Sequence, residues 1–198
     1  MKRMGSLEVG DRLPDVQLLD AEGSSIQLSS LVEGGPVVLV FLRYFGCTFC
    51  RAHVARVRDE REAFVEAGAR VVLIGQGRPD QAAAFCRDRQ LPFACTVDPD
   101  RRAFAAFGLG RARRRDLVDP RVATRAVRLA ADPQTRQGAI SGDPRQLGGT
   151  IVADRSGVIR FVHRNQTVWD DAPNDVVLSA VQEAARADVE GRPWRQAS

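Results

Sequence analysis

Residues 37–42 constrain the fold of this chain more than any other segment. They read Val-Val-Leu-Val-Phe-Leu, so all six are apolar and most are β-branched or aromatic. A strand without a polar face has to be covered on both sides, as in the middle of an α/β sheet. Residues 48–67 follow with apolar positions at roughly helical spacing, which predicts a helix that ends at Gly68. The sequence therefore predicts a central strand that leads into a helix.

The rest of the chain continues the alternation of strand and helix. The order strand, helix, strand, helix implies parallel strands joined by right-handed crossovers. Near the end, two short strands around an Arg-Ser-Gly turn predict a hairpin before a last helix. The expected elements are an N-terminal hairpin arm at 24–28, strands at 70–74, 93–97, 150–154 and 158–163, and helices at 79–89, up to 107 and at 173–186.

The length of 198 residues fits one domain. We predict a single domain over 1–198, with 108–148 as an insertion because these residues show no continuous strand pattern. Nine arginines and two aspartates lie between positions 101 and 128. They include Arg121, Arg125 and Arg128, whose helical spacing predicts a basic helical face. Such a face is usually solvated, and without stacked aromatic residues between the arginines we do not expect nucleic-acid binding.

The Cys47-Thr48-Phe49-Cys50 sequence lies where the central strand passes into the helix. Reactions in open α/β sheets gather at the carboxyl ends of strands, and a helix N-terminus favours an anion. Such a position lowers the pKa of a cysteine from ~8.5 to ~3.5–7.5. We expect Cys47 to be a nucleophile and Cys50, one turn later and less exposed, to be the resolving thiol that forms a disulfide with it. The alternatives are half of a metal site and inert packing.

Cys86 and Cys95 lie on different predicted elements. A tetrahedral zinc site usually needs two close cysteine pairs, so we expect no metal. Free cysteines are often buried, and we expect both residues to be core thiols. Mild oxidation should link Cys47 to Cys50 and leave the other two open to alkylation. A Cys86–Cys95 bridge, or a dimer linked through Cys47, would overturn the assignment of Cys50 as the resolving residue. His53 could tune the pair, although most histidines on helices are solvated.

With these residues, the chain resembles the alkyl hydroperoxide reductase and thiol-specific antioxidant superfamily, and within it the peroxiredoxin-like 2 group. The most specific part is 41–51, Phe-Leu-Arg-Tyr-Phe-Gly-Cys-Thr-Phe-Cys-Arg, which is similar to the group signature. Residues 10–15, 91–93, 98–100, 107–110 and 146–154 resemble other sections of the family. The resemblance implies a thioredoxin-like α/β fold: a central mixed sheet flanked by helices, an N-terminal hairpin and a basic helical insertion.

The resemblance also implies a peroxidase without metal or organic cofactor. It would reduce a hydroperoxide or a disulfide substrate and be reset by an external dithiol such as a thioredoxin or glutaredoxin system. Two positions depart from true peroxiredoxins: Tyr44 replaces a threonine and Gly148 an arginine, so Arg43 or Arg51 would have to supply the cation. The candidate site residues are Cys47 and Cys50 as catalytic residues, supported by Arg43, Tyr44, Thr48, Phe49, Arg51, Gly149 and Thr150.

Two other functions compete with a peroxidase. One is a thiol-disulfide oxidoreductase for protein partners, with Tyr44 and Phe49 framing the docking surface; the other is a non-catalytic binding module that uses the arginine-rich insertion. The longest apolar run is far shorter than the ~20 residues that span a bilayer. The N-terminal residues also lack the apolar stretch of a secretory leader. We therefore expect a cytoplasmic protein, in which a close cysteine pair is more often chemical than structural.

Overall fold

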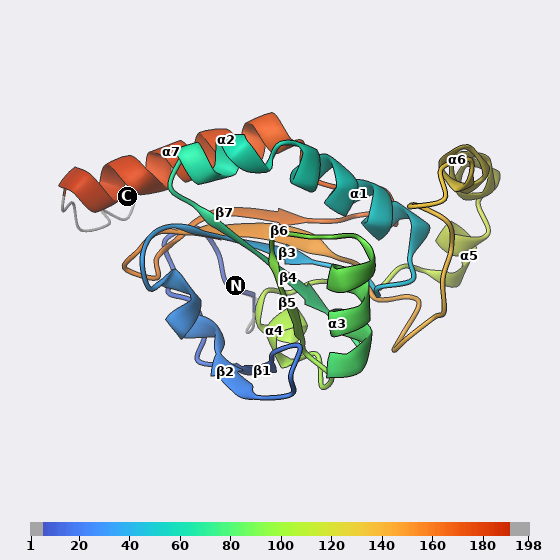
Figure 1. Cartoon of the computed structure of the whole chain (residues 1–198), viewed down its shortest axis with the longest axis horizontal. Coiled ribbons are helices and arrows are strands. Elements are labelled where there is room, and N and C mark those ends of the chain that lie inside the picture. Colours follow the sequence, from blue (N-terminus) through green and yellow to red (C-terminus); the bar gives the residue numbers. More distant parts are fainter. Residues whose placement is uncertain (1–5, 191–198) are drawn as a thin grey trace, which may run out of the picture.

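The computed structural model describes residues 6–190 (Figure 1). Seven strands form one mixed sheet in the order β2-β1-β5-β4-β3-β6-β7. The strands are β1 (Gln17–Leu19), β2 (Ser25–Gln27), β3 (Val37–Phe41), β4 (Arg70–Gly75), β5 (Ala94–Val97), β6 (Gly149–Ala153) and β7 (Ile159–Arg164). The helices are a 3-10 helix (Leu28–Val32), α1 (Thr48–Asp59), α2 (Arg61–Glu66), α3 (Pro79–Asp88), α4 (Arg102–Ala106), α5 (Arg114–Leu117), α6 (Pro120–Ala130) and α7 (Asn174–Glu190).

Strand β3 lies in the middle of the sheet and all five of its residues are buried. It pairs in parallel with β4 and antiparallel with β6. Its side chains alternate between the two faces, so Val38 and Val40 belong to one core cluster, while Leu39 and Phe41 belong to the other. The predicted central strand and its parallel neighbour are confirmed.

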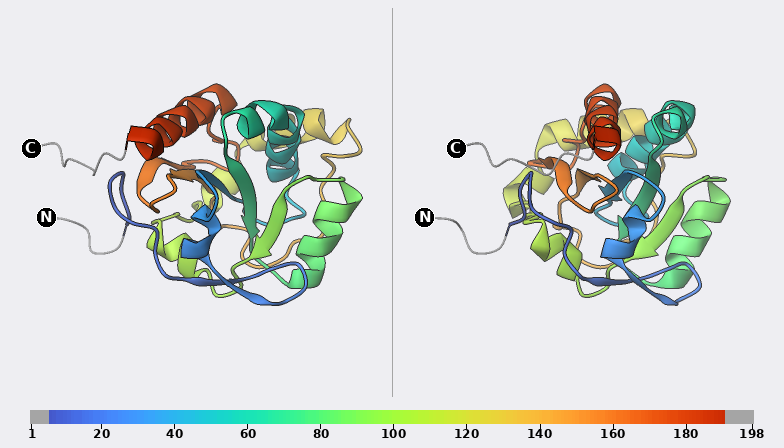
Figure 2. Two further views of the ribbon diagram at one scale, coloured as in Figure 1. Left: turned by 60° about the vertical axis from the view of Figure 1, so that its left-hand side comes forward. Right: turned by 90° about the vertical axis from the view of Figure 1, so that its left-hand side faces the viewer.

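The two faces of the sheet are covered by different helices. Helices α1, α2, α3 and α7 contribute to the core that contains Val40, and Figure 2 shows α7 beside α1 and α2. The 3-10 helix and α4 cover the opposite face, where the Phe41 ring meets Phe104 and Phe107 edge-on at centroid distances of 5.0 and 5.3 Å. This two-sided cover is the physical reason that β3 has no polar residue.

The helix predicted over 48–67 is divided in two. The chain leaves helical geometry at Glu60, whose φ and ψ are −103° and 15°. The Glu60 N–H still donates to Arg56 O, and Glu60 O accepts from the Ala63 N–H, so the break leaves few backbone groups unpaired. The change of direction brings Phe64 into the same core as Val57. The other predicted elements are found within a few residues of their expected bounds.

Helix α3 and strand β5 are joined by a disulfide between Cys86 and Cys95, with a Cα–Cα distance of 6.3 Å. The expectation that these two cysteines are free thiols is therefore wrong. The helix packs directly on the strand that follows it, so Cys86 faces Cys95 within the range that a disulfide bridges. Spacing along the sequence carries no information about that contact.

Residues 108–148 contain α5 and α6 and return across the start of α1 before they enter β6 (Figure 1). Helix α6 packs on α1. Its arginines Arg121, Arg125 and Arg128 are exposed, which confirms the predicted basic face. Within residues 6–190, no helix is both long and apolar enough to cross a membrane.

Candidate active site

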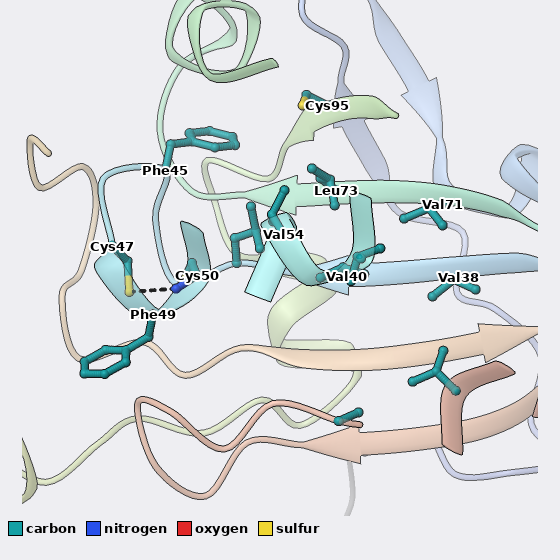
Figure 3. Close-up of a cluster of buried hydrophobic side chains, with 14 of the residues drawn as sticks. Val38, Val40, Phe45, Cys47, Phe49, Cys50, Val54, Val71, Leu73 and Cys95 are labelled. Carbon is teal, nitrogen blue, oxygen red and sulfur yellow. Dashed lines mark hydrogen bonds between the residues drawn. The ribbon is translucent and has the colours of Figure 1, made fainter. Parts of the chain in front are cut away.

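The loop between β3 and α1 places Cys47 at the N-terminus of α1, as the sequence predicts. The Cys47 sulfur accepts a hydrogen bond from the Cys50 backbone N–H at 3.4 Å (Figure 3). The Cys47 N–H donates to Tyr44 O at 3.1 Å and closes the turn before the helix. Gly46 is required here because a Cβ at this position would lie 2.0 Å from the Ala139 carbonyl oxygen.

Cys47 and Cys50 are free thiols and both are buried, with exposed fractions of 1% and 5%. Cys50 is thus not the more protected of the two, contrary to expectation. Gln137, from the 108–148 segment, lies over the start of α1. Its Oε1 accepts from the Thr48 N–H and hydroxyl at 3.4 and 3.3 Å, and its Nε2 donates to the Tyr44 hydroxyl at 3.4 Å. These hydrogen bonds tie Gln137 to Thr48 and Tyr44, the two residues that flank the Cys47 turn.

Arg43 supplies the cation next to Cys47. Its Nη1 lies 3.4 Å from the Cys47 sulfur, its Nε donates to Gln146 O at 3.1 Å, and its Nη2 donates to Pro144 O. The residue is only 5% exposed, and none of the ion pairs formed by residues 6–190 includes it. Because an uncompensated buried charge is unfavourable, this guanidinium stabilises an anionic sulfur.

Arg51, the second candidate for the cation, has another position. Its Nε donates to Phe45 O at 2.9 Å, and its Nη1 donates to Arg136 O. Arg51 therefore ties the 108–148 segment to the loop that carries the cysteines. Of the two arginines, only Arg43 makes a hydrogen bond to the sulfur.

The surroundings of the two sulfurs separate their acidities. A hydrogen bond from the Cys50 thiol lowers the pKa of Cys47 to about 7 against the opposing effect of burial, and the charge of Arg43 and the backbone N–H groups of Cys50 and Phe49 lower it further. Burial, together with Cys47, raises the pKa of Cys50 well above its usual value. Near neutral pH, Cys47 therefore ionises before Cys50, which keeps its proton. Burial and the Cys47 charge also raise the pKa of Tyr44, which keeps its hydroxyl proton.

Gly149 and Thr150 lie beside the end of β3, where they pair with Phe41 and Val40. A Cβ at Gly148 would lie 2.2 Å from Phe41 O. The backbone therefore leaves no room for the arginine that the resemblance places at position 148, and Arg43 reaches the sulfur from the loop that follows β3. The Thr150 hydroxyl is buried without a hydrogen-bond partner among the described residues.

Three glutamines hold the site together, and the sequence alone does not single them out. Gln137 joins Thr48 to Tyr44 across the start of α1, and Gln146 accepts from Arg43 through its backbone oxygen. Gln76, at the end of β4, is buried; its Nε2 donates to Arg43 O and Asp143 O, and its Oε1 accepts from the Asp143 N–H at 2.9 Å. Each of these contacts joins segments that are distant in the chain, so no local sequence pattern predicts them.

His53 is buried rather than solvated. Its Nδ1 lies 3.4 Å from Asp171 Oδ1, while Arg56 and Asn165 bind the same carboxylate at 3.1 Å each. Burial lowers the pKa of His53 and keeps its ring neutral. The Asp171 charge contributes to the raised pKa of Cys50, so this carboxylate helps to keep the second thiol protonated. Within residues 6–190, no group of three or more histidine, cysteine or acidic side chains is placed to hold a metal ion.

An ionised sulfur at a helix N-terminus, a protonated sulfur one turn later and a mixed sheet flanked by helices define a thiol-dependent oxidoreductase with a thioredoxin-like fold. Comparison with known families agrees, since residues 9–162 match the AhpC/TSA family. The chain belongs to this family.

Individual relatives support the same assignment. The chain is 26% identical to human peroxiredoxin-like 2C over 175 residues, which cover 84% of this chain and 77% of that protein. It is 27% identical to the chloroplastic peroxiredoxin Q of Populus jackii over 157 residues, 79% of this chain and 60% of the other. Among solved structures, peroxidoxin BcpB from Mycobacterium tuberculosis superposes with a TM-score of 0.67 at 22% identity and covers 89% of this chain and 97% of its own. The expected thioredoxin-like fold is confirmed.

Proposed function

We propose that this protein reduces hydroperoxides through a dithiol/disulfide cycle of Cys47 and Cys50. The observation that carries the proposal is the contact between the buried Arg43 guanidinium and the Cys47 sulfur. Together with the Cys50 hydrogen bond, it supports a Cys47 pKa of about 7. At neutral pH about half of the molecules then hold the reactive thiolate, because the pH equals the pKa.

The first half of the cycle oxidises Cys47. Its thiolate attacks the terminal oxygen of R–O–OH, a sulfur–oxygen bond forms, and the O–O bond breaks. The alkoxide takes up one proton and leaves as the alcohol ROH, while Cys47 becomes a sulfenic acid. The Arg43 guanidinium stabilises the charge as it passes from sulfur to oxygen, and the Tyr44 hydroxyl, when Gln137 has moved, is a donor for the departing oxygen.

The second half returns the pair to the dithiol. The Cys50 sulfur attacks the sulfenic acid of Cys47, the new disulfide forms, and the hydroxyl leaves as water with the Cys50 proton. An external dithiol then reduces the disulfide, gives up two electrons and two protons, and becomes a disulfide itself. A thioredoxin-type or glutaredoxin-type reductant supplies these electrons in a reducing compartment, for which we propose the cytoplasm.

Cys50 is the part of this proposal most in need of a direct test, because the Cys86–Cys95 bridge is an outcome that the sequence analysis named as overturning its role. The positions still support it: the bridge leaves Cys86 and Cys95 occupied, and Cys50 hydrogen-bonds to Cys47. Mass mapping of digested protein after one equivalent of peroxide should show a new Cys47–Cys50 link beside the existing bridge. A link from Cys47 to Cys86 or to Cys95, or a dimer through Cys47, would refute the assignment.

Peroxide consumption coupled to a thioredoxin system tests the activity itself. Wild-type protein should turn over, Cys47→Ser should not, and Cys50→Ser should complete one turnover and stop at the sulfenic acid.

A second function is also supported, because a pair one helical turn apart is suited to disulfide exchange with proteins. Reduction of insulin without measurable peroxide turnover would favour that function over the peroxidase.

A further inference from the structure

A pocket of about 230 Å³ opens between α1 and α6, directly beside the candidate active site. Its apolar wall contains Phe49, Leu129 and Trp169, and its rim carries Arg56, Arg125 and Arg128. The Phe49 and Trp169 ring centroids lie 6.2 Å apart at an angle of 56°. The described part of the chain thus combines aromatic surface and guanidinium groups in one cavity.

Phe49 connects this pocket to the reactive sulfur. Its backbone N–H is one of the groups that lower the pKa of Cys47, while its side chain forms the pocket wall. In Figure 3 the Phe49 ring and the Cys47 sulfur lie on the same side of the start of α1. A molecule that contacts this ring therefore lies against the first turn of α1, whose N-terminal residue is Cys47.

The rim is only partly neutralised: Asp171 also lines the pocket and pairs with Arg56, while Arg125 and Arg128 keep positive charge there. Arg56 shares Asp171 with His53 and Asn165. Arg125 and Arg128 are exposed, and neither takes part in an ion pair with any residue between 6 and 190. The Arg125 guanidinium lies 5.1 Å from the centroid of the Trp169 ring. Arginine bound to an aromatic face keeps its N–H groups free for an anion, and the planar fork fits a carboxylate.

We propose that this pocket binds the carboxylate-bearing end of an organic hydroperoxide and so makes the enzyme selective for anionic, amphipathic substrates. The carboxylate lies against Arg125 and Arg128, the apolar body contacts Phe49 and Trp169, and the hydroperoxide group points toward Cys47. The proposal rests on the peroxidase function above and adds a substrate class to it.

The size of the pocket limits that class. At roughly 30 Å³ per water molecule, its volume equals about eight waters, which corresponds to a single ring or a short alkyl chain. Pockets that enclose drug-sized ligands measure ~300–1,000 Å³. A substituted aromatic hydroperoxide with one carboxylate is therefore a suitable probe.

The first experiment compares cumene hydroperoxide with its ring-carboxylated form, and uses hydrogen peroxide as a third substrate. The Arg125→Gln/Arg128→Gln double variant should raise KM for the carboxylated substrate about three- to tenfold, because two weak, solvent-exposed charge pairs with the carboxylate are removed. KM for the two uncharged substrates should not change. Arg121→Gln, which removes an exposed arginine from the same helix outside this pocket, should affect none of them. Equal changes for all three substrates, or no change, would refute the proposal.

The second experiment measures binding without turnover. 4-Isopropylbenzoate, a carboxylate without a peroxide group, should quench the fluorescence of Trp169 in a saturable way in a Cys47→Ser/Trp194→Phe background. The quenching should weaken in the double arginine variant and be absent with the neutral amide. Carboxylate binding in this background, together with no peroxidase activity in the wild-type protein, would reject the proposed function and retain the pocket. Peroxidase activity without carboxylate binding would reject the pocket alone.

A protein partner is the competing occupant of the same rim. If the double variant slows reduction by thioredoxin and leaves KM for the carboxylated hydroperoxide unchanged, the arginines bind an acidic face of the reductant. That result would overturn the substrate proposal.

Discussion

Replacement of Arg43 by methionine should raise the pKa of Cys47 by one to two units. Two unit charges 3.4 Å apart interact by about 5 kcal/mol at an effective dielectric constant of ~20, which is an upper limit because water enters the variant site. The hydrogen bond from Cys50, the largest cause of the lowered Cys47 pKa, remains in place. At 1.36 kcal/mol per pKa unit, a rise of one to two units corresponds to ~1.4–2.7 kcal/mol of lost thiolate stabilisation. This value lies below the upper limit.

The consequence is a slower reaction at neutral pH. Since the wild-type Cys47 pKa is about 7, half of the protein is thiolate at pH 7. A rise of one to two units leaves ~9% to ~1%, so alkylation of Cys47 by iodoacetamide should slow about five- to fiftyfold. The difference should vanish above about pH 10, where both proteins are ionised. Alkylation rates at each pH, read by mass spectrometry of the peptide that contains Cys47 and Cys50, give the two titration curves.

Two control variants separate the loss of the Arg43 charge from a general disturbance of the site. Arg51→Met removes a neighbouring guanidinium that hydrogen-bonds backbone carbonyls rather than the sulfur, so it should move the Cys47 pKa much less. Arg43→Lys keeps the positive charge and should retain most of the lowered pKa, even if Arg43→Met disturbs the contacts with Gln146 and Pro144. An unchanged Cys47 pKa in folded Arg43→Met would refute the electrostatic role of this arginine.

Three other substitutions test separate parts of the structure. Gln137→Ala should speed alkylation of Cys47 severalfold at every pH, because it removes the side chain that covers the start of α1; an unchanged rate would show that this glutamine does not limit access. The Cys86→Ala/Cys95→Ala variant should lower the free energy of unfolding by ~2–3 kcal/mol through loss of a short closed loop and leave peroxide turnover intact, as urea titration and the coupled assay would measure. Asp98→Ala should cost about 2 kcal/mol in the same titration, because its carboxylate accepts three backbone N–H groups at the start of α4; a loss below 0.5 kcal/mol would contradict this role.

The accuracy of the sequence-based expectations depends on how far apart the interacting residues lie. The break at Glu60 could not be predicted, because the 48–67 segment favours helix throughout and the interruption serves the packing of Phe64. The expectation that Cys86 and Cys95 are free thiols was wrong for a similar reason. Whether two cysteines on separate elements form a disulfide depends on how the helix packs on the strand. The spacing of the cysteines along the sequence does not predict that packing.

The amino-acid sequence by itself determined the order of strands and helices and the place of Cys47 at a helix N-terminus, because these depend on neighbours a few positions away. Only the tertiary structure decided which arginine meets the sulfur. Arg43 is oriented by Gln146, 103 positions later, and Gly148 excludes a side chain because Phe41 lies against it. Contacts of this kind arise from the packing of distant segments. The same packing places a guanidinium beside the reactive sulfur, buries that sulfur and forms the aromatic pocket beside α1.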